Sequence, residues 1–236
     1  MRILAVDWSG SVSRATARRC IWVAEARRGR LEQLQGGRDR DEVVEFLLAE
    51  ATRDPKLVVG LDFAFGLPEW FARARGAATG RDVWELVARE GESWLGDPQP
   101  PFWRARKPPL DGPELRRTEA DVASGTIRPK SVFQLGGAGQ VGTASLRGIP
   151  YLLRLQGAFA IWPFDEPRLP LVVEIYPRLH QHLAPPAAPN EHARDAAGSA
   201  LAMSEWEGEW TGLLRAAPYT LEGRIWRPGP SLDSGA

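Results

Sequence analysis

The chain has 236 residues, of which 43% are hydrophobic, and its 30 basic side chains balance 30 acidic ones. These values are typical of a folded globular protein, and they exclude a disordered chain or a basic nucleic-acid-binding surface over the whole molecule. No apolar run approaches the ~18 residues of a membrane-spanning helix, and Asp7 interrupts the first apolar segment too early for a signal peptide. We therefore expect a single domain over residues 1–236 that is cytoplasmic and has no membrane partner.

The N-terminal part of the chain predicts a buried strand followed by a hairpin. The apolar run RILAVDW contains Asp7 near its end and is typical of a strand buried on both faces. The next residues, SGSVSRATARR, are polar and predict a turn. CIWVAEARRGRLEQLQGG then predicts two strands, the first of which includes Cys20, joined by a turn at Arg28 and Gly29.

A helix and a second buried strand are predicted next. Apolar residues at positions 43, 44, 47, 48 and 51 have the spacing of an amphipathic helix, and Asp39 or Asp41 can cap its start. KLVVGLDFAFGLP predicts a strand whose apolar run is followed directly by Asp62. The strand is expected to end before GLP, because glycine and proline interrupt regular structure.

Residues 69–170 are expected to form an insertion within the domain. RDVWELVAREG predicts a helix, and the proline-dense GDPQPPFWRARKPPLDGPE predicts an ordered surface loop. GGAGQVG matches the G-x-G-x-x-G spacing of a dinucleotide-binding loop, but no helix or βαβ unit is predicted after it, so the match is weak. Residues 101–150 hold eight basic and four acidic side chains, which favours a local electropositive surface.

The last third of the chain predicts one more buried strand and one more helix. LPLVVEIYP is apolar with Glu174 near its end, and Asn190 can cap a helix over NEHARDAAGSALAMSEW. EGRIWRP predicts a short terminal strand. Three fully apolar strands that alternate with helices predict an α/β fold whose sheet is covered on both faces.

Four acidic residues share an unusual setting. Asp7, Asp62 and Glu174 lie at or near the ends of predicted buried strands, and Asp195 lies among alanines in the last helix. Buried carboxylates are costly unless they are paired or bind a metal, and ligands gather at the C-terminal edge of an α/β sheet. Together the four would suit Mg²⁺ or Mn²⁺, which prefer oxygen ligands. For each acid alone, a helix cap, a turn or an ion pair with arginine is the alternative.

These motifs carry a resemblance to a known family. The order strand-Asp, hairpin, helix, strand-Asp, strand, helix-Asp resembles the ribonuclease H-like fold, and VDWSG, LDFAFGLP, VVEIYPRL and HARDAAGSALA resemble the DUF429 family of predicted nucleases. The resemblance implies a mixed five-stranded sheet with an antiparallel second strand, and an insertion between the fourth and fifth core strands. It also implies metal-dependent cleavage of a nucleic acid, with Asp7, Asp62, Glu174 and Asp195 as candidate catalytic residues and metal ligands.

Other residues are candidates for contacts with the substrate. Arg116, Arg117, Lys130 and Ser131 carry donors that suit phosphate oxygens, although the glycines beside them are equally explained by backbone geometry. His192 lies one helical turn before the last of the four acids and is a candidate for proton transfer.

Aromatic residues are the remaining candidates for nucleic-acid contacts. Trp84, Trp94 and Trp103 would stack on bases, or, as the favoured alternative, pack against prolines and order the insertion. Trp8 directly follows Asp7 and is expected to point to the opposite face of its strand, outside the site.

Three functions fit these patterns. The favoured one is a metal-dependent nuclease of the two-metal type, with Mg²⁺ or Mn²⁺ as cofactor and a nucleic acid as partner. The second is a non-catalytic nucleic-acid-binding or scaffold protein on the same fold. The third is a lobe of an actin–hexokinase-like phosphotransferase, whose first phosphate loop VDWSGS resembles, but such enzymes need two lobes. The sequence leaves open whether the protein is a homo-oligomer.

Overall fold

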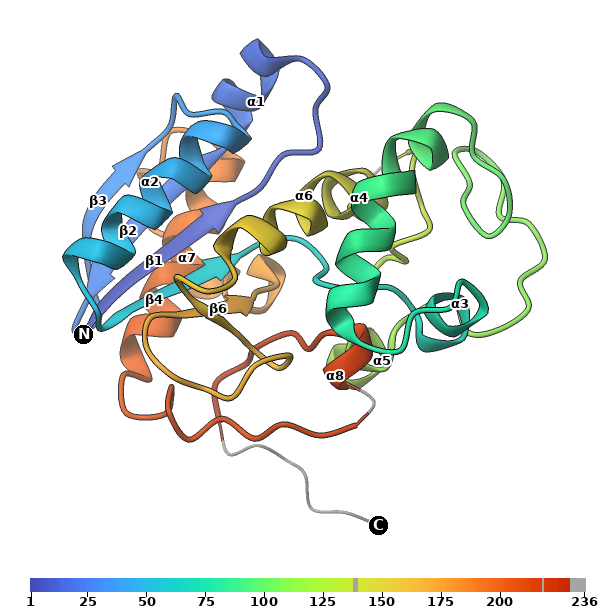
Figure 1. The fold of residues 1–236 in the computed structure, drawn as a ribbon. Coiled ribbons are helices and arrows are strands. Elements are labelled where there is room, and N and C mark those ends of the chain that lie inside the picture. Colours follow the sequence, from blue (N-terminus) through green and yellow to red (C-terminus); the bar gives the residue numbers. More distant parts are fainter. Residues whose placement is uncertain (138–139, 218, 230–236) are drawn as a thin grey trace.

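The protein is built around one mixed β-sheet with helices on both faces (Figure 1). The computed structural model describes residues 1–137, 140–217 and 219–229. Within these residues, six strands form the sheet in the order β3-β2-β1-β4-β6-β5. The strands are β1 (Arg2–Asp7), β2 (Trp22–Arg27), β3 (Arg30–Gln35), β4 (Leu57–Leu61), β5 (Ala160–Ile161) and β6 (Leu171–Glu174).

Strand direction divides the sheet into two parts. β2 runs antiparallel to both of its neighbours, β1 and β3. The β1, β4, β6 and β5 strands are parallel to one another. The predicted hairpin is confirmed, with its turn at Arg28 and Gly29, both of which have a positive φ.

The helices include two predicted from sequence with their caps. Asp39 caps α2 and forms a reciprocal capping box with Glu42, and Asn190 caps α7. The helices are α1 (Arg14–Cys20), α2 (Arg40–Arg53), α3 (Glu69–Ala74), α4 (Gly80–Gly96), α5 (Arg117–Val122), α6 (Val141–Leu155), α7 (Glu191–Glu205) and α8 (Tyr219–Glu222), with 3-10 turns η1 (Pro177–Leu179) and η2 (Gln181–Leu183).

Two hydrophobic cores lie on opposite faces of the sheet. One face packs against α2, α4 and α6, and this core includes Leu47, Trp84 and Ile149. The other face packs against α7, whose alanines and Met203 lie against β1 and β2. Trp84 and Trp94 are buried, and Trp103 is half-buried against the first core, so packing rather than base stacking accounts for them.

Several local predictions are wrong. The sheet has six strands rather than five, because the two-residue β5 pairs with the free edge of β6 and is too short to show any periodicity. The polar segment after β1 forms α1, capped by Ser13, and Cys20 ends this helix instead of starting a strand. The predicted terminal strand is a single bridge between Glu174 and Ile225.

The glycine-rich segment also differs from its prediction. A helix does follow it, since α6 begins at Val141 immediately after Gln140. Glycines and a proline inside α6 weaken its sequence signal, although its apolar face is well defined. Among the described residues, no strand of the sheet leads directly into the segment, because α5 is the element before it. Gly139 of the G-x-G-x-x-G match lies outside the described residues.

The register of the parallel strands decides which side chains share a face. Val6 of β1 is level with Leu61 of β4, and Leu61 is level with Glu174 of β6. Since side chains alternate along a strand, these three residues point to the face covered by α4 and α6. Asp7 and Asp62, one residue later, are therefore directed to the face covered by α7.

Gly60 permits a close approach between β4 and α7. A Cβ at this position would lie 2.6 Å from the Met203 sulfur and 2.7 Å from a methyl carbon of Ile175.

Among the described helices, none is both long enough and apolar enough to cross a membrane.

We expect Gly60→Ala to lower the free energy of unfolding by about 1 to 3 kcal/mol, because the added methyl group overpacks the contact with α7. Gly96→Ala at the end of α4 is the control, since a Cβ there meets no atom within 4 Å. Urea denaturation measures both. Equal stability of the two variants would contradict the close approach.

Candidate functional site

Asp7 and Asp62 meet at the C-terminal edge of two neighbouring strands. The backbone amide of Asp62 donates to the carbonyl oxygen of Val6 at 3.0 Å, which extends the pairing of β1 and β4 by one residue. The side chains of Asp7 and Asp62 share a hydrogen bond, and this requires a proton on one of the two carboxyl groups. Asp7 is only 4% exposed, whereas Asp62 is half-buried and lines the cavity described below.

The α7 helix brings two more functional groups to this pair. Its N-terminus is fixed by Asn190, whose side chain accepts a hydrogen bond from the amide of Ala193 at 2.9 Å. One turn into the helix, His192 Nδ1 lies 2.8 Å from Asp7 Oδ2. Asp195, on the same side of the helix, is half-buried and forms a side-chain hydrogen bond with Gln181.

The carboxyl groups at this site have raised pKa values. Burial is the main cause for Asp7, whose pKa rises to about 6 although the hydrogen bond from His192 opposes the shift. The pKa of Asp62 lies well above its ordinary value because of burial and the charges of Asp7 and Asp195. Burial also raises the pKa of Asp195, while the hydrogen bond to Asp7 raises that of His192. The site therefore favours extra positive charge.

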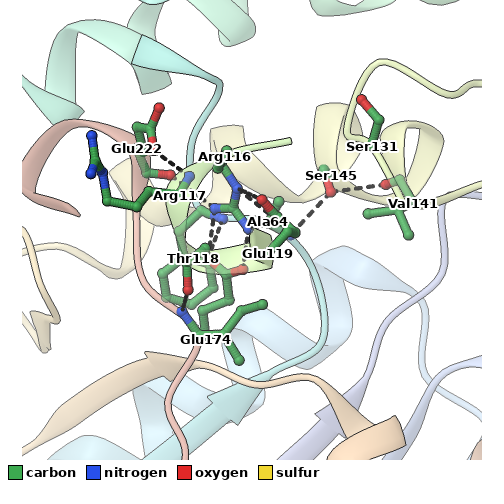
Figure 2. Close-up of polar contacts among 12 residues, drawn as sticks. Ala64, Arg116, Arg117, Thr118, Glu119, Ser131, Val141, Ser145, Glu174 and Glu222 are labelled. Atoms are coloured by element: carbon green, nitrogen blue, oxygen red, sulfur yellow. Dashed lines mark hydrogen bonds and ion pairs between the residues drawn. The ribbon is translucent and has the colours of Figure 1, made fainter. Parts of the chain in front are cut away.

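Glu174 lies on the other face of the sheet and has a different set of contacts. Its Oε2 accepts hydrogen bonds from the backbone amide of Phe65 and from Arg116 Nη1, both at 2.9 Å. Its Oε1 accepts from Arg116 Nη2 (Figure 2). Both oxygens of Glu174 are therefore occupied by protein donors.

Arg116 is the centre of a buried ion-pair network (Figure 2). Its side chain is 1% exposed and contacts Glu119 as well as Glu174. Its Nη1 also donates to the carbonyl oxygen of Glu222 at 2.8 Å. Burial raises the pKa of Glu119 to about 7, although Arg116 opposes the shift.

Glu222 links two helix N-termini to this network. Its carboxylate accepts from the amide of Glu69 at 2.6 Å, at the start of α3, and from the amide of Arg117 at 2.8 Å, at the start of α5. A carboxylate at a helix N-terminus satisfies free amides and interacts favourably with the helix dipole. Residues from the insertion and from the C-terminal segment are thereby joined at the sheet edge.

A cavity of about 250 Å³ opens beside these groups. Asp62, Asp195 and Glu174 line it, together with Lys130 from the insertion. Arg116 also lines it, but its donors are directed to the carboxylates of Glu119 and Glu174 and to the carbonyl oxygen of Glu222.

Two predicted phosphate-binding residues lie elsewhere. Ser131 is buried and donates to the carbonyl oxygen of Glu114 at 2.6 Å. Arg117 is exposed and lines a separate surface hollow beside Trp70.

The cavity also contains residues that the sequence did not indicate. Trp8 points to the face opposite Asp7, as expected, but it still lines the cavity, because the cavity opens at the sheet edge where the two faces meet. Tyr176 and Arg178 line it as well. Both follow Glu174 within the segment VVEIYPRL, and their proximity to a candidate acid is the only signal that could have identified them.

No preformed metal centre is present among the residues that the structure describes: no three His, Cys, Asp or Glu side chains are placed to hold an ion together. No protein-family model, curated protein or solved structure matches the chain. The fold and the site define an α/β protein with a buried carboxyl pair at the edge of its sheet and a cavity beside it.

We expect Arg116→Met to lower the free energy of unfolding by about 3 to 5 kcal/mol, because it leaves Glu119 and Glu174 buried without their cation. Arg117→Met, which changes the neighbouring exposed arginine, should stay within about 0.5 kcal/mol of the wild type. Urea denaturation compares the two. A loss as small for Arg116→Met as for Arg117→Met would show that the network does not stabilise the fold.

Asp7→Asn should make the metal-free protein more stable near neutral pH. The folded state binds the Asp7 proton more tightly than the unfolded state between pH 3.8 and about 6, so wild-type stability falls as the pH rises through this range. The raised pKa of His192 acts in the same direction, since its stabilising charge is lost as the pH rises.

The stability difference between Asp7→Asn and the wild type should therefore shift in favour of the variant as the pH rises, reaching about 1 to 3 kcal/mol at neutral pH. Denaturation in the presence of a chelator, at a series of pH values, measures this difference. Asp111→Asn, at an exposed position, is the control and should show no such trend. A pH-independent difference for Asp7→Asn would contradict the raised pKa.

Proposed function

We propose that the protein is a metal-dependent nuclease with a ribonuclease H-like fold, related to the DUF429 family. The observation that carries the proposal is the Asp7–Asp62 pair at the carboxyl edge of adjacent parallel strands, with Asp7 buried and Asp195 nearby on α7. The strand order β3-β2-β1-β4-β6, with β2 antiparallel, is compatible with that fold, and β5 is then an addition at the edge.

The donor set suits Mg²⁺ or Mn²⁺. Asp7 and Asp62 share a proton where a cation would relieve the repulsion between them, and carboxylate oxygens are the ligands that these hard ions prefer. Mg²⁺ is commonly bound by one or two carboxylates, with water and substrate phosphate as further ligands, so a complete protein cage is not required. A bound ion would stabilise charge on the phosphate and lower the pKa of water.

The remaining residues have roles that follow from their contacts. His192 holds Asp7 through Nδ1 and is placed to hold or release a proton beside it. Asp195 is the third candidate ligand, whereas Glu174 and Arg116 support the cavity wall. Hydrolysis adds the oxygen of water to phosphorus and breaks the bond from phosphorus to one sugar oxygen, which takes the second proton of water.

We expect Mn²⁺ to bind the wild type saturably in calorimetry and to bind Asp7→Asn at least about 100-fold more weakly. Removing a metal ligand lowers metal affinity more than removing a residue that only supports a ligand. The same variant should lose Mn²⁺-dependent cleavage across a panel of DNA and RNA substrates. Asp111→Asn, with its exposed carboxylate, should behave as the wild type in both assays.

The outcomes separate the three candidate functions. Full metal-dependent turnover by Asp7→Asn would exclude the carboxyl pair as the catalytic centre. Salt-dependent nucleic-acid binding without any metal requirement would favour the non-catalytic alternative. Saturable ATP binding that competes with Mn²⁺-dependent cleavage would favour the phosphotransferase alternative.

A further inference from the structure

The cavity beside Asp62 has walls from parts of the chain that are far apart in sequence. Pro129 and Lys130 of the insertion lie on its wall with Ala144 of α6. Tyr176 and Arg178 follow β6 and also line it. The Ser145 hydroxyl fixes α6 here, since it accepts from the amide of Ala64 at 3.0 Å and donates to the carbonyl of Val141 (Figure 2). The carboxyl edge is therefore a walled pocket and not an open surface.

The charges around this pocket are separated. Asp62 follows β4 and Asp195 lies on α7, whereas the exposed cations Lys130 and Arg178 come from a loop and from η1. Neither cation forms an ion pair within the part of the chain that the structure describes, although arginine pairs with acids at many other places on the surface. Two unpaired cations beside a carboxyl cluster suit an anionic group with several acceptor oxygens, such as a phosphate.

Trp8 supplies an independent observation at the same place. It lines the pocket and is 6% exposed, so an aromatic ring forms part of the wall. The pocket thus combines an aromatic wall with free cations, and these are components that bind a nucleotide.

The volume limits what can enter. At about 250 Å³ the cavity is close to the lower end of small-molecule sites, which begin at roughly 300 Å³. This space suits one nucleotide unit and not two paired strands. The neutral overall charge also disfavours duplex, since duplex-binding proteins gain affinity from many phosphate contacts.

Within the proposed nuclease function, we propose that the pocket receives an unpaired nucleic-acid strand, with one phosphate between Lys130 and Arg178, and that its walls exclude duplex.

The test is fluorescence anisotropy with a labelled single strand, and with the same strand annealed to its complement, in low salt with a chelator present to prevent cleavage. The single strand should bind at least about tenfold more tightly than the duplex. Lys130→Ala and Arg178→Ala should each weaken binding of the single strand by about threefold to tenfold. Each should also reduce the slope of log Kd against log salt concentration by about one, the value for one phosphate contact. Arg117→Ala, an exposed cation outside the pocket, is the matched control.

Three results would overturn the inference: no binding of the single strand, equal binding of duplex, or an equal loss of affinity in Arg117→Ala. Mn²⁺-dependent cleavage measured on the same two substrates separates this inference from the proposed function. Duplex cut as fast as single strand leaves the nuclease intact and removes the inference. Preferential binding of the single strand without any cleavage keeps the pocket and removes the nuclease.

Discussion

The cavity walls depend on one buried cation, the guanidinium of Arg116. Arginine cannot lose its charge in a protein, so a side chain that is 1% exposed must be surrounded by acceptors. Glu174 provides them from the end of β6, Glu119 from α5, and the carbonyl oxygen of Glu222 from α8. Arg116 therefore fixes the insertion to the sheet, 58 residues away from Glu174 in sequence. This contact also positions Glu119, which lines the cavity from α5.

The register of the sheet assigns different tasks to acids that look alike. Glu174 is level with Leu61, one residue before Asp62, and this single step directs it to the opposite face. On that face it meets Arg116, whereas Asp7 and Asp62 meet one another and the histidine of α7. Glu174 is thus neutralised by an ion pair with Arg116, whereas Asp7 and Asp62 keep their raised pKa values.

The sequence predicted the elements whose signals are local, and it missed those that depend on packing. Apolar runs and caps such as Asp39 and Asn190 determine β1, β4, β6, α2 and α7. Except for α2, these elements carry or directly precede the candidate acids. The face of Glu174 depends on register, which no single segment encodes. Trp8 and Arg178 belong to the cavity only because separate loops meet at the sheet edge. The two-residue β5 exists because β6 offers it a free edge.

The distribution of arginine points to a site that is kept open. Arginine neutralises Glu174, Glu50 and Asp39, which are all buried. No arginine or lysine of the described residues forms an ion pair with Asp7, Asp62 or Asp195, and the one such partner is His192. An arginine placed there would relieve the repulsion and stabilise the fold, but it would occupy the space that the proposed metal ion or phosphate needs. The carboxyl pair costs stability in the empty protein, and that cost is expected where a ligand supplies the missing charge.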